Sequence, residues 1–159
     1  MIYSTNELAF MKAITVSELT QAVIDGSDEG FNVLVGSTPT HINTFPNYDD
    51  HPRILVHFDN GIPSSTAAGA FQILEHFFDF YTKSLDLDGT FSKDNQRAIA
   101  HQYFRECHAL ADIAAGNFLA ALSLVRTRWA SLPDSGNNQH ENSVALLKQA
   151  YLDAGGTIA

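Results

Sequence analysis

A single glutamate, Glu18, is the first candidate for chemistry in this sequence. At about 100° per residue it falls on the same arc of a helical wheel as Phe10, Met11 and Ile14. Carboxylates avoid apolar faces unless they are paired or functional, and burial raises the pKa of a carboxyl, as a general acid near neutral pH requires. An ion pair with an arginine, or a solvated place at a helix end, would explain Glu18 as well. Periodicity alone favours that structural interpretation.

Two further segments could serve a binding site. Residues 65–74 are rich in small side chains, which predict a helix N-terminus able to pack closely on a ligand or on a neighbouring helix. Residues 48–53 combine a tyrosine with two acids, a histidine, a proline and an arginine. Asp49 or Asp50 could be a second catalytic carboxylate. A capped helix start and a turn are the respective structural alternatives.

Other catalytic chemistries find little support. The one cysteine, Cys107, excludes an internal disulfide and is interpreted as a buried, inert thiol. The seven histidines show no HExxH or similar zinc spacing, and no phosphate-loop or dinucleotide fingerprint occurs. We therefore expect neither a metal nor an organic cofactor.

These residues must be positioned by a mixed set of elements. Ser4 to Glu7 predict a capping box that opens a helix over residues 6–20. Short strands are predicted over 31–35 and 54–58, with a Pro- and Asp-rich loop between them and a turn at residues 59–61.

The chain then looks helical from Ser64 onward. The first predicted helix is a long apolar segment over 67–85, and the next two cover 92–107 and 108–115, the latter ending at Gly116. Asn117 is expected to cap a helix that runs through 129. After a loop over 133–138, a last helix stops at Gly155-Gly156. The expected fold class is α+β, one domain over residues 1–159, with a small β-rich lobe and a larger helical lobe flanking a cleft.

Charge and composition restrict the partners. The 159 residues carry 9 Lys+Arg against 18 Asp+Glu, a net charge of −9 with histidine neutral. This balance argues against nucleic-acid binding and against docking on anionic membranes. No apolar stretch is long enough to span a bilayer, and no secretory signal opens the chain. We expect a protein that stays in the cytoplasm until something releases it.

Six segments, taken in order, resemble the lambda-type phage endolysins. The six segments are Ser17-Glu18 and residues 30–36, 48–53, 65–74, 129–133 and 154–157, and together they cover nearly the whole chain. The DHPR, STAAGAFQ and WASLP blocks within them are specific in combination. This resemblance reverses the interpretation of Glu18 and favours a catalytic role.

The resemblance implies a lysozyme-like α+β fold and a lytic transglycosylase. Such an enzyme breaks the bond between N-acetylmuramic acid and N-acetylglucosamine without water and leaves a 1,6-anhydro end. Glu18 would be the single acid/base. It would protonate the glycosidic oxygen and then take the proton of the muramic C6 hydroxyl as that oxygen closes on C1, while the substrate's acetamido group meets the positive charge.

Residue roles carry over by position. Tyr48, Phe71 and Gln72 would line the cleft, with Gln72 on an acetamido group, while Arg53 would brace the loop and Trp129 would pack between helices. Three positions depart from the family pattern, where Gly, Arg and an aromatic are usual: Leu19, Ala70 and Asn137.

The implied partner is the glycan strand of peptidoglycan, bound by a monomer. The protein would be made in the host cytoplasm and act in the periplasm once a holin or another lesion opens the inner membrane. Two alternatives stay open: a hydrolytic muramidase that pairs Asp49 or Asp50 with Glu18, and a non-catalytic glycan-binding or phage structural protein that kept the fold.

Overall fold

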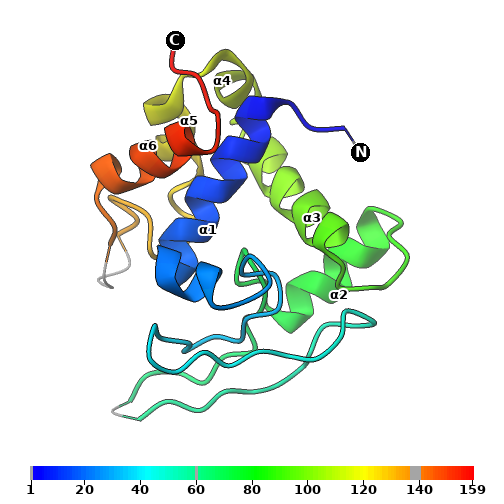
Figure 1. The fold of residues 1–159 in the computed structure, drawn as a ribbon. Helices are drawn as coiled ribbons and strands as arrows, with labels where there is room; N and C mark the ends of the chain where they lie inside the picture. The colour runs from blue at the N-terminus through cyan, green and yellow to red at the C-terminus, as the bar shows by residue number, and fades with distance from the viewer. Residues whose placement is uncertain (1, 60, 137–140) are drawn as a thin grey trace. The chain divides into compact units, whose positions relative to one another are not determined.

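The computed structural model describes residues 2–59, 61–136 and 141–159, which are predominantly helical (Figure 1). Six helices lie in these ranges: α1 (Thr5–Asp25), α2 (Glu75–Ser84), α3 (Lys93–Glu106), α4 (Leu110–Ala115), α5 (Phe118–Val125) and α6 (Val144–Asp153). Asn60 of the predicted turn, and Asn137 and Asn138 of the predicted loop, lie outside the described residues.

The chain forms two compact units, each described by itself. The first unit runs up to Glu18 and resumes at Ala100, and it holds most of α1 with α4, α5 and α6. The second unit is the continuous segment Leu19–Ile99, which holds the loops and α2. Helices α1 and α3 pass from one unit to the other. The single domain and its two lobes stay predictions.

The start of α1 confirms the predicted capping box. The backbone N–H of Ser4 donates to the Glu7 carboxylate at 2.7 Å, and the Glu7 N–H donates to the Ser4 hydroxyl at 3.2 Å. The predicted end near residue 20 also marks a real feature. Thr20 adopts φ 62° and ψ 152°, which interrupts α1 before it continues to Asp25.

Aromatic packing forms the core of the first unit. Phe10 of α1 makes edge contacts with Phe104 of α3 and Phe118 of α5, at centroid distances of 5.2 and 5.8 Å. Phe118 in turn contacts Tyr151 of α6 at 5.0 Å. Each of these side chains is almost fully buried. The apolar face of α1 therefore anchors the helix that carries Glu18.

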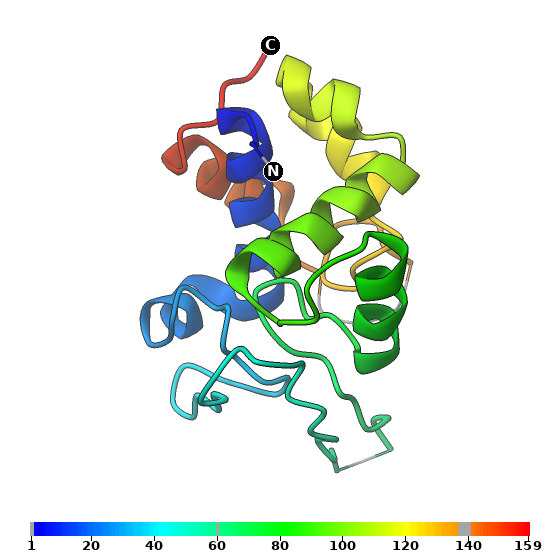
Figure 2. The same ribbon diagram turned by 90° about the vertical axis from the view of Figure 1, so that its right-hand side faces the viewer.

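In the second unit the two predicted strands are only fragments. In the described residues, pairing within 31–35 is limited to Val33 and Leu34, and pairing within 54–58 is limited to Val56. Figure 2 shows extended runs through this region without strand arrows. Gly30 and Gly36 take φ values of 88° and 81°, so the chain bends on both sides of the first pair. In the described residues, the β part of the predicted α+β class is therefore reduced to isolated bridges.

The predicted helix N-terminus over 65–74 is wrong, because α2 begins only at Glu75. Ala68 pairs with both Leu34 and Ile73, which makes the segment a bridge-and-turn structure. Gly69 and Gln72 have φ values of 76° and 47°, in the left-handed region that a helix excludes. The backbone N–H groups of Ala68, Gly69 and Ile73 donate to carbonyl groups of Ile73, Val33 and Ala68, so they are not available to a ligand.

The remaining helices follow the predictions except at α5, where two corrections apply. Ser92 caps α3 by accepting from the Asn95 N–H at 3.3 Å, and Gly116 ends α4 at φ 78°. Asn117 does not cap α5 with its side chain, because its amide donates to the Asp112 carboxylate at 3.0 Å. Helix α5 also ends at Val125, short of residue 129. Helix α6 stops before Gly155, as predicted.

Candidate active site

Glu18 lies near the end of the first segment of α1, two residues before the kink. Its neighbours Ser17 and Leu19 are buried, whereas Glu18 keeps partial exposure. Thr20 occupies a backbone conformation that non-glycine residues rarely adopt, and such conformations concentrate at functional sites. The helix thus presents a carboxyl group at a strained break rather than in the middle of a regular face.

Among the described residues, the carboxyl group of Glu18 has a hydroxyl partner and no cation beside it. The Ser131 hydroxyl donates to Oε1 of Glu18. Burial raises the pKa of Glu18 to about 7, and the Ser131 hydrogen bond opposes that rise by stabilising the ionised form. No charged side chain in the described ranges contributes to the shift. The group can therefore hold or release a proton near neutral pH.

Tyr48, Phe71, Gln72 and Arg53 all belong to the second unit. The Tyr48 hydroxyl donates to Asp28 at 2.6 Å, and its ring meets Phe45 edge-on at 5.6 Å. The pKa of Tyr48 is raised by burial and by the neighbouring Asp28 carboxylate. Tyr48 is thus a fixed, neutral, half-buried phenol with part of its surface exposed.

Arg53 gathers three carboxylates around its guanidinium. It lies 2.7 Å from Asp50, 3.0 Å from Glu75 and 2.7 Å from Asp79, so it ties the 48–53 loop to α2. The arginine holds the pKa of Asp50 and of Asp79 below the usual range. These ion pairs are those that a bracing role would need, and the role of Arg53 in the site stays a prediction.

Phe71 and Gln72 lie in the turn that precedes α2. Phe71 is 2 % exposed and packs edge-on against Phe31 at 6.2 Å, so its ring is a core side chain of the second unit. Gln72 is partly exposed, and its amide donates to the Gly69 carbonyl at 3.0 Å. Of these two residues, Gln72 is the one with side-chain surface available to a ligand.

Sequence reasoning missed the residue that shapes this turn, Gln96 of α3. Its fully buried amide accepts from the Ala70 N–H at 3.0 Å and donates to the carbonyls of Phe31 and Phe91. A Cβ at Gly69 would lie 2.1 Å from the Gln96 oxygen, so only glycine fits there. A glutamine in a polar helical stretch carries no sequence signal of such burial.

Ser17, Ser131 and Asn142 are the other residues without a predicted role. The two serine hydroxyls are 2.7 Å apart, and the Asn142 amide donates to the Ser17 carbonyl at 2.9 Å. Ser17 and Ser131 stand inside the segments that carry the family resemblance, but sequence spacing of more than a hundred residues hides their contact.

Two of the three positions that depart from the family pattern are buried, as is Trp129. Leu19 and Ala70 are buried at 6 % and 0 % exposure. Asn137 lies outside the described residues. Trp129 is buried and packs on Tyr103 and Phe104 of α3, at 5.6 and 6.1 Å between ring centroids.

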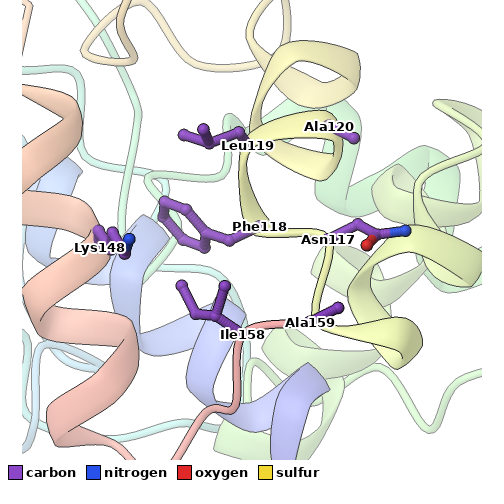
Figure 3. Close-up of a pocket in the computed structure, with 8 residues that line it drawn as sticks. Asn117, Phe118, Leu119, Ala120, Lys148, Ile158 and Ala159 are labelled. Atoms are coloured by element: carbon purple, nitrogen blue, oxygen red, sulfur yellow. The ribbon is translucent and has the colours of Figure 1, made fainter.

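The first unit also has a separate pocket of about 300 Å³ (Figure 3). Phe118, Leu119 and Ile158 give it an apolar wall, and Lys148 of α6 lies at one side. Its lining includes no acidic side chain, so it cannot host the acid/base chemistry expected of Glu18.

Within the described ranges, histidine, cysteine and acidic side chains nowhere gather in threes that could hold a metal ion. None of the helices described is both long and apolar enough to cross a bilayer.

Comparison with known proteins identifies the family. A family model described as Endolysin matches residues 8–158. The endolysin of Escherichia phage P2 is 37% identical over 97% of this chain and 95% of its own length. The endolysin of Escherichia phage lambda is also 37% identical, over 82% of this chain and 78% of its own length.

Solved structures agree with this result. Bacteriophage lambda lysozyme in complex with a chitohexasaccharide superimposes with a TM-score of 0.89 at 33% identity, covering 100% of this chain and 99% of that chain. A second structure of lysozyme from bacteriophage lambda gives a TM-score of 0.84 at 32% identity and the same coverage. The fold is lysozyme-like, and the chain belongs to the phage endolysins, the family of enzymes that act on peptidoglycan in host lysis.

Proposed function

We propose that this endolysin cleaves the bond between N-acetylmuramic acid and N-acetylglucosamine as a lytic transglycosylase, with Glu18 as its single acid/base. The observation that carries the proposal is the setting of the Glu18 carboxyl group, which accepts from the neutral Ser131 hydroxyl. Burial raises its pKa to about 7, and no cation among the described residues contributes to the shift. A carboxyl group of this kind is protonated often enough to act as an acid and is still ionised readily enough to act as a base.

The reaction needs two proton transfers at one group. Glu18 donates its proton to the glycosidic oxygen as the bond from that oxygen to C1 breaks, and N-acetylglucosamine leaves with a free hydroxyl. The substrate's acetamido group meets the positive charge at C1. The muramic C6 hydroxyl then attacks C1, and its proton returns to the Glu18 carboxylate. The product is an anhydro sugar, no water is consumed, and Glu18 ends the cycle protonated.

A hydrolytic muramidase would need a second carboxylate to activate water. Asp50 is poorly suited to that role, because the Arg53 guanidinium engages both of its oxygens and lowers its pKa. Asp49 is exposed to solvent, unlike the partly buried Glu18. These observations support the single-carboxylate route.

Glycan binding is assigned to four side chains of the second unit. Gln72 would hydrogen-bond an acetamido group, and the ring of Tyr48 would contact a sugar face. Phe71 would support the turn that carries Gln72, since its ring packs on Phe31. Arg53 would keep the loop that carries Tyr48 on α2. The chitohexasaccharide complex of lambda lysozyme supports an oligosaccharide of N-acetylated sugars as the ligand class.

The route to the wall is part of the same proposal. The protein would act as a monomer in the periplasm after a holin or another lesion opens the inner membrane. Its charge of −9 gives no electrostatic attraction to an anionic wall, so the pairing with substrate would depend on local contacts.

Digestion of purified peptidoglycan with the wild-type protein and with Glu18→Gln tests the proposal. Mass spectrometry should find muropeptides lighter than hydrolytic products by one water molecule, and the variant should release none. Reducing-end products from the wild type would instead indicate a hydrolase. Wild-type digestion that Glu18→Gln leaves unchanged would remove Glu18 from the mechanism. No products from the folded wild type would favour a binding or structural protein.

A further inference from the structure

A hydrogen-bonded group of three residues leads to Glu18 from within the first unit. Ser131 contacts the Glu18 carboxyl, Ser17 contacts Ser131 at 2.7 Å between hydroxyls, and the Asn142 amide lies 3.3 Å from the Ser17 hydroxyl. Ser17 is 4 % exposed, and Asn142 is partly buried. We call Ser131, Ser17 and Asn142 the hydroxyl relay.

We propose that the hydroxyl relay positions one oxygen of Glu18 and sets its proton affinity, with Ser131 as the positioning residue. The inference rests on the proposed function, because it assigns a purpose to the relay in proton transfer by Glu18. It adds residues from the chain's C-terminal half to the catalytic account of a glutamate near the N-terminus.

The direction of the relay follows from the number of hydrogens. Each serine hydroxyl has one hydrogen, and Ser131 gives its own to Glu18. The hydrogen between the two serines must then come from Ser17, and the Ser17 oxygen accepts from the Asn142 amide. All three groups consequently donate toward the carboxylate, which stabilises its ionised form.

The same atoms can serve the protonated form. When Glu18 is protonated, its proton lies on Oε2, and Oε1 still accepts from the Ser131 hydroxyl. Both states of Glu18 therefore keep the hydrogen bond to Ser131. Proton transfer requires no movement of the backbone at this point.

The relay also distinguishes the two carboxyl oxygens. Oε1 is held by Ser131, whereas Oε2 has no hydrogen-bond partner within the described ranges. Glu18 keeps partial exposure, so an oxygen remains accessible to substrate. We assign proton delivery to Oε2, and fixing of the carboxyl plane to Oε1.

Charged groups near the relay in sequence are engaged elsewhere. The Glu141 carboxylate, next to Asn142, accepts from the Ser135 hydroxyl and from the N–H groups of Asp134 and Gly136. Arg128, three residues before Ser131, pairs with Glu106 at 2.5 Å. The relay therefore acts on Glu18 through neutral hydrogen bonds, in agreement with the absence of a charged contributor among the described residues.

Ser131→Ala tests this assignment. Removing a donor to a carboxylate should raise the pKa of Glu18 by about one unit and move the alkaline limb of kcat upward by the same amount. We expect kcat to fall about tenfold, and KM to change less than about twofold. Ser131→Thr, which keeps the hydroxyl, should restore most of kcat and the wild-type pH profile. Ser17→Ala should shift the profile in the same direction by a smaller amount.

A carboxyl NMR titration of Glu18 in the same variants gives a measurement independent of activity. An upward shift of the pKa in Ser131→Ala supports the proposal even if Glu18→Gln retains activity and the proposed function fails. An unchanged pKa, or a loss of kcat that is equal at every pH, would make Ser131 a structural tie and overturn the proposal. If Ser131→Ala does not fold, the Ser17→Ala titration decides in the same way.

Discussion

The surroundings of Glu18 raise the pKa of its carboxyl group, whereas Arg53 lowers the pKa of the carboxyl groups beside it. Burial raises the pKa of Glu18 to about 7, with no contribution from a cation in the described part of the chain. Asp50 and Asp79 share the Arg53 guanidinium, which lowers the pKa of both. A buried carboxyl group without a neighbouring cation can exchange a proton near neutral pH. A carboxyl group paired with an arginine stays ionised at neutral pH and can hold a loop in place.

This contrast explains why carboxylate count is a poor guide to mechanism in this chain. Residues 48–53 offer two aspartates, but one of them is committed to Arg53. Another acid on α1, Glu7, is likewise committed to the Ser4 cap and to His101 at 3.0 Å. Among these acids, Glu18 alone combines a raised pKa with a neutral partner.

The largest expected effect is on the rate of peptidoglycan cleavage. Glu18→Gln should lower kcat by about a thousandfold or more, because loss of a general acid/base costs roughly 10²–10⁴ in rate. Glu7→Gln is the matched control on the same helix and should keep kcat, with lower stability from loss of the cap. Turbidity loss of purified peptidoglycan measures both. Comparable losses in the two variants would mean that the contrast between the acids has no catalytic meaning.

The second effect is on stability and depends on pH. The pKa of Glu18 is raised from its ordinary 4.5 to about 7. The contribution of Glu18 to the free energy of unfolding is fully present below pH 4.5, where the group is protonated in both the folded and the unfolded chain. This contribution is lost as the pH rises through 7. Glu18→Gln removes this loss and should raise the free energy of unfolding at pH 8 by about 2–3 kcal/mol relative to wild type.

Urea denaturation of wild type and Glu18→Gln at pH 4.5 and at pH 8 measures this difference. Equal free energies of unfolding at the higher pH would show that Glu18 ionises in the folded protein as easily as in the unfolded chain.

The features that could be predicted from the sequence are those that depend on residues close together in the chain. The capping box at Ser4 and the stops at Gly116 and Gly155 were predictable, because each depends on residues a few positions apart. The apolar arc and the family resemblance together indicated Glu18. The turn over residues 69–72 was not predictable, since its small residues also fit a helix start and the deciding partner, Gln96, is distant in the chain.

A smaller effect is expected at Arg53. Arg53→Ala should lower the free energy of unfolding at pH 7 by about 1 kcal/mol, since the ion pairs are partly exposed and largely screened. The pKa of Asp50 and of Asp79 is lowered, so this contribution is present above pH 3.8 and is lost at more acidic pH. Arg53→Lys should be intermediate. A difference that persists in acid would assign the effect to packing of the arginine stem.

The smallest effect should follow Asp49→Asn. This exposed acid has no role in the single-carboxylate route, so kcat should stay within about twofold of wild type and the anhydro product should be unchanged. Mass analysis of the muropeptides provides the check. A large loss of rate in this variant would revive the hydrolytic alternative with Asp49 as the second carboxylate.

The pKa of Glu18 itself is the most direct test of the account. Carboxyl-labelled glutamate in the wild-type protein, followed by NMR from acid to alkaline pH, reports the titration of this group, with Glu18→Gln assigning its resonance. The account predicts a midpoint of about 7, the result of burial partly offset by Ser131. A midpoint near the ordinary value of 4.5 would leave Glu18 ionised at neutral pH and contradict its role as the acid.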